Sequence, residues 1–214
     1  KDEVLKSYFS TTKDKLIIIL NNSGIDSFEP KLNSQSLDDH SCEVDINTET
    51  INFPKNFIWG TATAAHQVEG NNSNNNWFEW ENKLDKNGKY RIHNNQRSGL
   101  AADHWNRYPQ DIQLMKELGV NHYRFSIEWS KIEPSQGFID KTVILHYKNL
   151  CDSLKKNNIT PVVTLHHFTN PIWFEKMGAF EKEENCKYFI NFVKIIFKEL
   201  NYIVPIWCTF NEPA

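Results

Sequence analysis

An alternation of strand and helix patterns between residues 57 and 210 is the feature that most limits how this chain can fold. Short runs rich in β-branched and aromatic residues are separated by longer segments whose apolar residues are spaced three and four apart. We predict strands at 57–63, 121–129, 159–165 and 203–210, and helices at 103–118, 140–156 and 188–200. The alternation implies right-handed crossovers and a parallel sheet with its helices outside it. A doubly wound sheet and a barrel both satisfy this order.

Polar side chains follow every predicted strand. They are Gln67 after the first, Glu128 at the end of the second, His166 and His167 after the third, and Asn211 and Glu212 after the fourth. In a parallel barrel the reacting groups lie at the C-terminal strand ends, so Glu212 is a candidate catalytic acid. No Gly-rich phosphate loop follows a strand, so nothing supports a nucleotide-binding doubly wound sheet. Hydrogen-bonding groups interspersed with Trp and Phe suit a sugar ring, which has polar hydroxyls and apolar faces.

The composition excludes several classes of protein. With 214 residues, 39% of them hydrophobic, the chain can bury a sizeable core. Its net charge of -3 gives no broad basic face, so we expect neither nucleic acid nor an anionic membrane surface as a partner. No apolar run approaches the roughly 18 residues of a membrane helix. The N-terminus has no secretory pattern, so we expect a cytoplasmic location. The four cysteines form no CxxC pair, which argues against a zinc site or a disulfide framework.

The first 52 residues differ in character from the rest of the chain. They are rich in Asn, Ser and Asp, and only residues 16–20 resemble a strand. So little apolar surface cannot offset the entropy lost on ordering. We therefore predict a poorly ordered N-terminal extension at 1–52 and a folded domain at 53–214.

Five motifs then indicate a family. They are NFIWGTATAAHQVEG at 56–70, DHWNRY at 103–108, YRFSIEW at 123–129, TLHHF at 164–168 and TFNEP at 209–213. In this order and spacing they resemble family 1 glycoside hydrolases, the β-glucosidase-like (β/α)8 barrels. The resemblance implies an α/β fold, a TIM barrel truncated here to about its first four β/α units. Strands one and four would then be open edges.

The resemblance also implies roles for five residues. Glu212 matches the general acid/base, Asn211 the residue that binds the sugar 2-hydroxyl, and Gln67 and His167 ligands of the glycone hydroxyls. Arg124 matches the arginine beside the nucleophile, where its positive charge keeps that carboxylate ionised. No metal or organic cofactor is implied, because two carboxylates suffice for the reaction.

Structural roles are the alternative for residues near these motifs. Arg124 could serve as a buried ion-pair partner, and we expect His166 to pack or cap locally. The other structural candidates are Glu69 and Glu128, in hydrogen-bond networks, and Trp129 and Trp173, in core or rim packing. The long polar stretch at 71–99, which contains several aromatic residues, is interpreted as a functional loop or as a cover for the barrel rim.

Two departures from the family pattern matter for function. Phe168 stands where the family commonly has Trp, so an indole N–H donor is lost and the sugar preference is open. A retaining mechanism also needs a second carboxylate about 5 Å from the acid, and in this family it follows the seventh strand. We therefore predict a retaining β-glycoside hydrolase, acting on a β-glycoside or oligosaccharide, in an incomplete chain that is inactive alone. The alternatives are a non-catalytic glycan-binding barrel and a 6-phospho-β-glycosidase. The oligomeric state is not predicted.

Overall fold

The computed structural model describes residues 6–8, 17–19 and 53–213, and the chain divides into two units, Lys1–Lys55 and Asn56–Ala214. In the first unit, β1 (Lys6–Tyr8) pairs antiparallel with β2 (Ile17–Ile19). β2 lies within the strand that the sequence predicts at 16–20. The predicted lack of order in the rest of 1–52 concerns residues outside the described ranges, so it stays a prediction.

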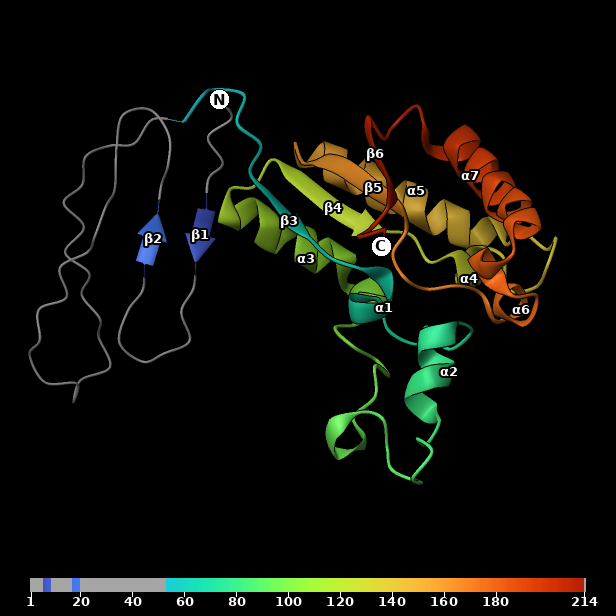
Figure 1. Cartoon of the computed structure of the whole chain (residues 1–214). Helices are drawn as coiled ribbons and strands as arrows, with labels where there is room; N and C mark the ends of the chain where they lie inside the picture. Colours follow the sequence, from blue (N-terminus) through green and yellow to red (C-terminus); the bar gives the residue numbers. More distant parts are fainter. Residues whose placement is uncertain (1–5, 9–16, 20–52, 214) are drawn as a thin grey trace, which may run out of the picture. The chain divides into compact units, whose positions relative to one another are not determined.

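The second unit is built on a four-stranded parallel sheet (Figure 1). Its strands, side by side in chain order, are β3 (Gly60–Ala62), β4 (His122–Ser126), β5 (Thr160–His166) and β6 (Ile206–Phe210). The long crossover helices between them are α3 (His104–Leu118), α5 (Lys141–Lys156) and α7 (Cys186–Leu200). In register, His122 stands opposite Gly60 on one side and Thr160 on the other. The predicted element order and the parallel sheet are confirmed.

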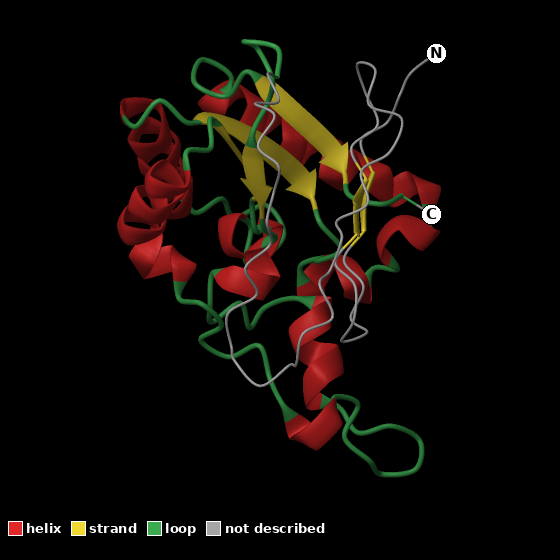
Figure 2. Ribbon diagram, turned by 90° about the vertical axis from the view of Figure 1, so that its left-hand side faces the viewer, coloured by secondary structure: helices red, strands yellow, loops and turns green. Residues whose placement is uncertain are grey.

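The three crossover helices lie on one face of this sheet. Each connection joins a strand to its neighbour in the same direction along the sheet, and right-handed crossovers of that kind place their helices on the same side. α5 lies between the other two, because it contacts both α3 and α7. Figure 2 shows the sheet together with these helices.

Local backbone and side-chain interactions fix one end of each of two long helices. Gly119 ends α3 in the left-handed conformation, with φ of 81°. α5 begins at its N-cap Asp140, whose side chain accepts hydrogen bonds from the backbone N–H groups of Thr142 and Val143. The end of α3 sets where β4 enters the sheet.

The core lies between the sheet and the helices and is centred on Trp129. The Trp129 ring, 1% exposed, contacts Phe174, Phe189 and Phe192 at centroid separations of 4.7, 5.6 and 5.0 Å. The half-buried Trp173 packs edge-on against it at 5.7 Å. Both tryptophans therefore pack in the core, as predicted.

Several strand bounds differ from the prediction. β3 has three residues instead of the seven at 57–63, and an added Cβ at Gly60 would come within 2.9 Å of the carbonyl oxygen of His122. β4 ends at Ser126, and the end of the predicted strand forms α4 (Trp129–Ile132). β6 is not buried on both faces, since Ile206 and Phe210 are 37% and 36% exposed. The reason is its position at the end of the sheet.

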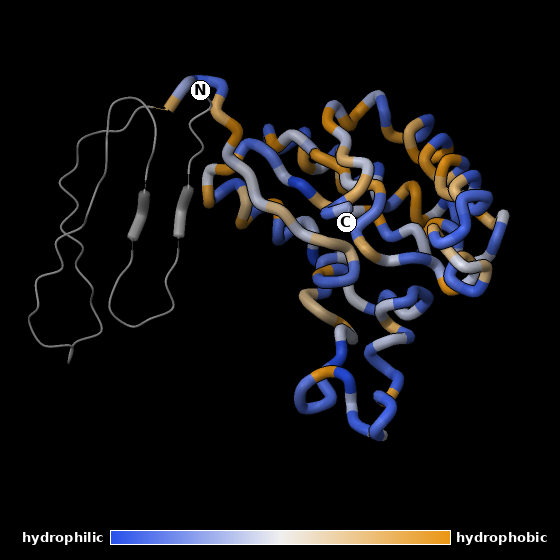
Figure 3. Tube along the Cα trace, in the orientation of Figure 1, coloured by the Kyte–Doolittle hydropathy of each residue, from blue (hydrophilic) through white to orange (hydrophobic). Residues whose placement is uncertain are grey.

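The predicted loop at 71–99 contains regular structure. α2 (Asn76–Asn82) begins there because Asn75 Oδ1 accepts the N–H of Phe78 at 2.9 Å. Most of the segment beyond α2 is hydrophilic (Figure 3). The remaining short helices are α1 (Ala65–Val68), α6 (Ile172–Lys176) and the 3-10 turns His93–Asn95, Ala179–Glu181 and Glu183–Asn185.

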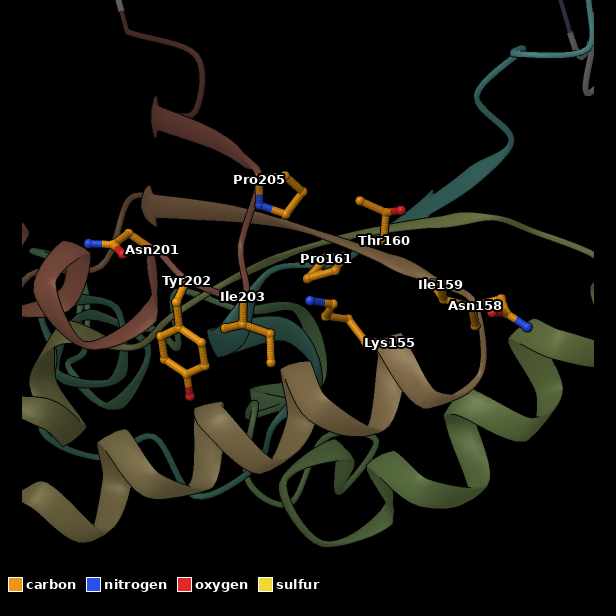
Figure 4. Close-up of a pocket in the computed structure, with 9 residues that line it drawn as sticks. All are labelled: Lys155, Asn158, Ile159, Thr160, Pro161, Asn201, Tyr202, Ile203 and Pro205. Carbon is orange, nitrogen blue, oxygen red and sulfur yellow. The ribbon is translucent and has the colours of Figure 1, made fainter.

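A cavity of about 390 Å³ lies at the N-terminal ends of β5 and β6. Its lining includes Lys155, Thr160, Tyr202 and Pro205 (Figure 4). This is the opposite end of the strands from the polar residues that the sequence singles out. Within the described ranges, every helix is too short or too polar to cross a membrane.

Candidate active site

Two of the predicted substrate ligands lie at one cavity at the C-terminal end of the sheet. Gln67, in α1 after β3, and His167, directly after β5, both line a cavity of about 460 Å³. Trp77 of α2 and Phe168 line it too. Exits from strands far apart in the sequence therefore form one site, as parallel strands require.

Arg124 joins the middle of this site to the end of β6. Its Nε donates to Thr164 Oγ1 on β5 at 2.9 Å, and its Nη2 donates to Asn211 Oδ1 at 2.7 Å. The backbone N–H of Asn211 also donates to the carbonyl oxygen of His166 at 2.9 Å. Arg124 is half-buried, and among the described residues no carboxylate lies within ion-pair distance of it. The alternative of a structural ion pair therefore has no partner in the described part of the chain.

The charges of two other predicted site residues, Arg124 and Glu212, act on the imidazole of His167. Burial lowers its pKa below the ordinary value, the charge of Arg124 lowers it further, and the carboxylate of Glu212 opposes them. All three groups are thus near enough to interact electrostatically. His167 Nδ1 is buried, and no hydrogen-bond partner for it occurs in the described residues. A buried polar atom without a partner is unusual in a native protein.

Glu212 follows β6 directly and is exposed to solvent in this chain. Its φ of 46° lies in the left-handed region, which a residue other than glycine adopts at a cost. The neighbouring Asn211 is fixed by its two hydrogen bonds to β4 and β5. The position of Glu212 on the sheet is therefore determined by its neighbour's contacts.

Asn76 is a site residue that sequence reasoning missed. Its Nδ2 donates to the carbonyl oxygen of Phe168 at 3.4 Å, and its Oδ1 accepts the N–H of Asn170 at 2.9 Å. Its own N–H donates to Asn170 O at 3.1 Å. These bonds hold Phe168 in the left-handed region, with φ of 69°, and its ring 6.3 Å from that of Trp77. The sequence signals a helix start at Asn75, but no local pattern signals these contacts of Asn76 with the loop after β5.

Glu128 ties the loops after β3, β4 and β5 together. It is fully buried, and its carboxylate accepts hydrogen bonds from Ser130 Oγ at 2.6 Å, Thr169 Oγ1 at 3.0 Å and Asn72 Nδ2 at 3.4 Å. Burial raises its pKa, and the nearby Glu69 carboxylate adds to that effect. The interpretation of Glu128 as a structural network residue is confirmed.

Glu69 forms the second part of this buried network. One carboxylate oxygen accepts from the Tyr147 hydroxyl at 2.6 Å, and the other accepts from Lys131 Nζ at 3.0 Å and Asn72 Nδ2 at 3.3 Å. The Tyr147 hydroxyl in turn accepts the N–H of Glu128 at 2.8 Å. The two carboxylates therefore share the amide of Asn72, Lys131 pairs with Glu69, and neither carboxylate lines the cavity.

His166 packs locally, as predicted. Its Nε2 lies 2.8 Å from Asn170 Oδ1, and its ring contacts Phe180, Phe189 and Phe210. It therefore supports the base of the site from within the core. No group of three or more His, Cys, Asp or Glu side chains in the described ranges is placed to hold a metal ion.

Comparison with known proteins places this geometry in a family. The model of glycosyl hydrolase family 1 matches residues 49–214. The chain belongs to glycosyl hydrolase family 1. It is 40% identical over 167 residues to β-glucosidase A of Acetivibrio thermocellus, a match that covers 77% of this chain and 37% of that protein.

Solved structures of family 1 proteins give the same result. A β-glycosidase from Pyrococcus horikoshii is 44% identical, with a TM-score of 0.67, over 75% of this chain and 36% of its own. A β-glucosidase from Thermotoga maritima, solved in complex with castanospermine, is 31% identical, with a TM-score of 0.71, over 75% of this chain and 37% of its own. The chain thus spans a little more than a third of the length of these family 1 relatives.

Proposed function

We propose that this chain carries the acid/base side of the active site of a retaining β-glycosidase of the β-glucosidase type. The observation that supports this most directly is the cluster at the C-terminal end of the sheet. Gln67 and His167 line one cavity, and Arg124, Asn211 and Glu212 lie beside His167.

Each residue suits a step of glycoside hydrolysis. Glu212 protonates the oxygen of the departing group and later removes a proton from the attacking water. Asn211, fixed through its side-chain oxygen by Arg124, keeps its amide N–H groups for the sugar 2-hydroxyl. The Nδ1 of His167, which has no hydrogen-bond partner among the described residues, takes a hydrogen bond with a glycone hydroxyl, and so does the exposed side chain of Gln67.

The reaction needs a second carboxylate, and Arg124 marks its place. A retaining mechanism uses a nucleophile about 5 Å from the acid, which forms the glycosyl-enzyme intermediate. The guanidinium of Arg124 pairs with no carboxylate among the described residues, so it is available to keep a nucleophile ionised. The 214-residue chain is therefore inactive by itself. The substrate of the active site with its nucleophile present is a β-glycoside or oligosaccharide.

The test is hydrolysis by a completed chain. We would join this chain, at residue 214, to the part of β-glucosidase A that lies beyond its match, and assay two β-glucosides. One has an alkyl leaving group, which needs protonation, and the other a dinitrophenyl group, which departs without it. If Glu212 is the acid, Glu212→Gln slows alkyl glucoside cleavage by about 100-fold or more and the initial cleavage of the dinitrophenyl glucoside far less.

A matched control is Glu184→Gln, which changes an exposed carboxylate away from the cavity lining. If Glu212→Gln slows the cleavage of both glucosides equally, or leaves both rates unchanged, Glu212 is not the acid. A fused protein that binds glucosides but hydrolyses neither would favour a glycan-binding barrel.

A further inference from the structure

The cavity at His167 has a second wall, formed by residues of the segment that follows α2. We call this the outer wall, and its members are Ile92, Gln96, Arg97 and Ser98. The two ends of the cavity differ in exposure, because His167 Nδ1 is buried whereas Arg97 is exposed. A sugar held at the His167 end therefore leaves the outer wall to the group attached to that sugar, which departs toward solvent.

Arg97 is held in place on the outer wall by its neighbours. Glu81, a buried residue of α2, accepts the N–H of Ser98 on one carboxylate oxygen at 3.0 Å and the Ser98 hydroxyl on the other at 2.7 Å. The guanidinium of Arg97 lies 5.9 Å from the centre of the Tyr90 ring. Within the described ranges no carboxylate pairs with Arg97, so its charge is available to a ligand.

Neighbouring cations of the same segment have other partners. Lys83 pairs with Glu79 at 3.1 Å, and the guanidinium of Arg91 lies 5.4 Å from the centre of the Trp80 ring. Neither Lys83 nor Arg91 lines the cavity. Among the described residues that do line it, Arg97 is the one lysine or arginine.

His66 of α1 gives the cavity a second fixed donor. Asn75 Oδ1 accepts the N–H of Phe78 at 2.9 Å, so Asn75 Nδ2 is the atom that lies 3.1 Å from His66 Nδ1. Because an amide nitrogen only donates, Nδ1 accepts, and the neutral ring carries its proton on Nε2. Burial lowers the pKa of His66, against the opposing charges of Glu81 and Glu69, which favours the neutral ring. In the described part of the chain Nε2 makes no hydrogen bond.

We propose that the outer wall, with His66, is an anion subsite for the leaving group of the glycoside, selective for an aryl group that carries a carboxylate. This inference rests on the proposed function. Arg97 and the Nε2–H of His66 only donate hydrogen bonds, which matches a group that only accepts them. Trp77, which lines the cavity and is 44% exposed, offers a ring face to the aryl part.

A phosphate on the sugar is the other source of an anion with the same acceptor chemistry. It would lie on the part of the ligand held at the buried His167 end of the cavity. The exposed position of Arg97 suits the leaving group better, because that group extends toward solvent.

The first measurement compares the binding of two glucosides by titration calorimetry. The para-carboxyphenyl and para-carbamoylphenyl β-glucosides have nearly the same shape and differ in charge. We expect the chain to bind the carboxylate about tenfold more tightly, since charge-assisted hydrogen bonds are about twice as strong as neutral ones. Arg97→Gln should remove this preference, and His66→Phe should reduce it. Arg91→Gln is the matched control, because it removes an exposed arginine that also lies over an aromatic ring but does not line the cavity.

The second measurement uses the joined protein, in which this chain is completed by the rest of β-glucosidase A. The readout is the ratio of kcat/KM for the two glucosides. The reactivity of the leaving groups is the same for every variant, so it cancels when these ratios are compared. Arg97→Gln should lower the ratio about tenfold, mainly through KM, because the subsite holds the leaving group before and during bond cleavage. Arg91→Gln should leave the ratio unchanged.

The outcomes separate the subsite from the proposed function. A preference for the carboxylate that depends on Arg97, in a joined protein that hydrolyses neither glucoside, supports the subsite and rejects the proposed function. Hydrolysis with the same ratio in all variants keeps the function and rejects the subsite. Equal effects of Arg91→Gln and Arg97→Gln also overturn it, since they would reflect net charge alone. Binding of glucose 6-phosphate that depends on Arg97 assigns the anion to the sugar and overturns the proposal.

Discussion

Replacing Tyr147 by phenylalanine isolates the buried network that ties the loops of the site together. Tyr147 is 1% exposed, and its hydroxyl donates to Glu69 at 2.6 Å and accepts the N–H of Glu128 at 2.8 Å. Phenylalanine keeps the ring and its packing and removes only the oxygen. The carboxylate oxygen of Glu69 and the N–H of Glu128 then remain buried without these partners.

The expected cost follows from those two groups. An unsatisfied buried amide costs about 2 kcal/mol, and an unsatisfied oxygen of a charged carboxylate costs at least about as much. Roughly 1 kcal/mol is recovered, because the hydroxyl no longer loses its own hydration on burial. The free energy of unfolding should therefore fall by about 3 kcal/mol, which lowers Tm by about 6–12 °C for a domain of this size.

Urea unfolding followed by tryptophan fluorescence, with thermal unfolding followed by circular dichroism, measures this loss. Tyr188→Phe is the control, since the half-buried Tyr188 hydroxyl makes no hydrogen bond to the described residues, and it should change stability by less than about 0.5 kcal/mol. If the two variants differ by less than about 1 kcal/mol with unchanged slopes in urea, the reasoning that assigns Tyr147 a stabilising role is refuted.

Three further changes test other parts of the chain. Burial raises the pKa of Glu128 above 4.5, so at pH values between 4.5 and the raised pKa the native state binds a proton that the unfolded state does not, and its stability increases as the pH falls. Glu128→Gln lacks this stabilisation and should therefore lose more stability than the parent between pH 7 and pH 5. Equal shifts of the urea midpoint in the two proteins would contradict this. Phe192→Ala, at a fully buried ring, should cost about 3–5 kcal/mol in urea unfolding, whereas the exposed Phe197→Ala should cost less than about 1 kcal/mol. Asn76→Ala removes two hydrogen bonds that hold the loop at Phe168, so hydrogen exchange of the 167–170 amides should quicken; unchanged exchange would show that other contacts hold the loop.

The sequence predicts the order of elements because that order depends on local periodicity. The helix over 140–156 begins one residue later than predicted because Asp140 is its N-cap, a difference that periodicity alone does not resolve. The apolar pattern of β6 indicates a strand that is buried on both faces, but burial depends on what lies beside the strand. The pattern at 203–210 records the side chains of the strand and not what lies beside it.

The candidate site, like the fold, could be predicted only in part from the sequence. The motif resemblance names Gln67, His167, Arg124, Asn211 and Glu212, and the structure brings these residues to the C-terminal end of one sheet. The part played by Asn76 depends on side-chain bonds across 92 and 94 positions of sequence, which no local pattern encodes. The shared use of Asn72 by Glu69 and Glu128 is likewise a product of folding.

The buried network of Glu69, Glu128 and Tyr147 also has a consequence for synthesis on the ribosome. All its members precede residue 170, and so do the loops that it fixes after β3, β4 and β5. A nascent chain is made from its N-terminus, and domains generally fold in that order. The loops after β3, β4 and β5 can thus become rigid before β6 and Glu212 leave the exit tunnel, so that Glu212 is added to a group of loops whose shape is already fixed.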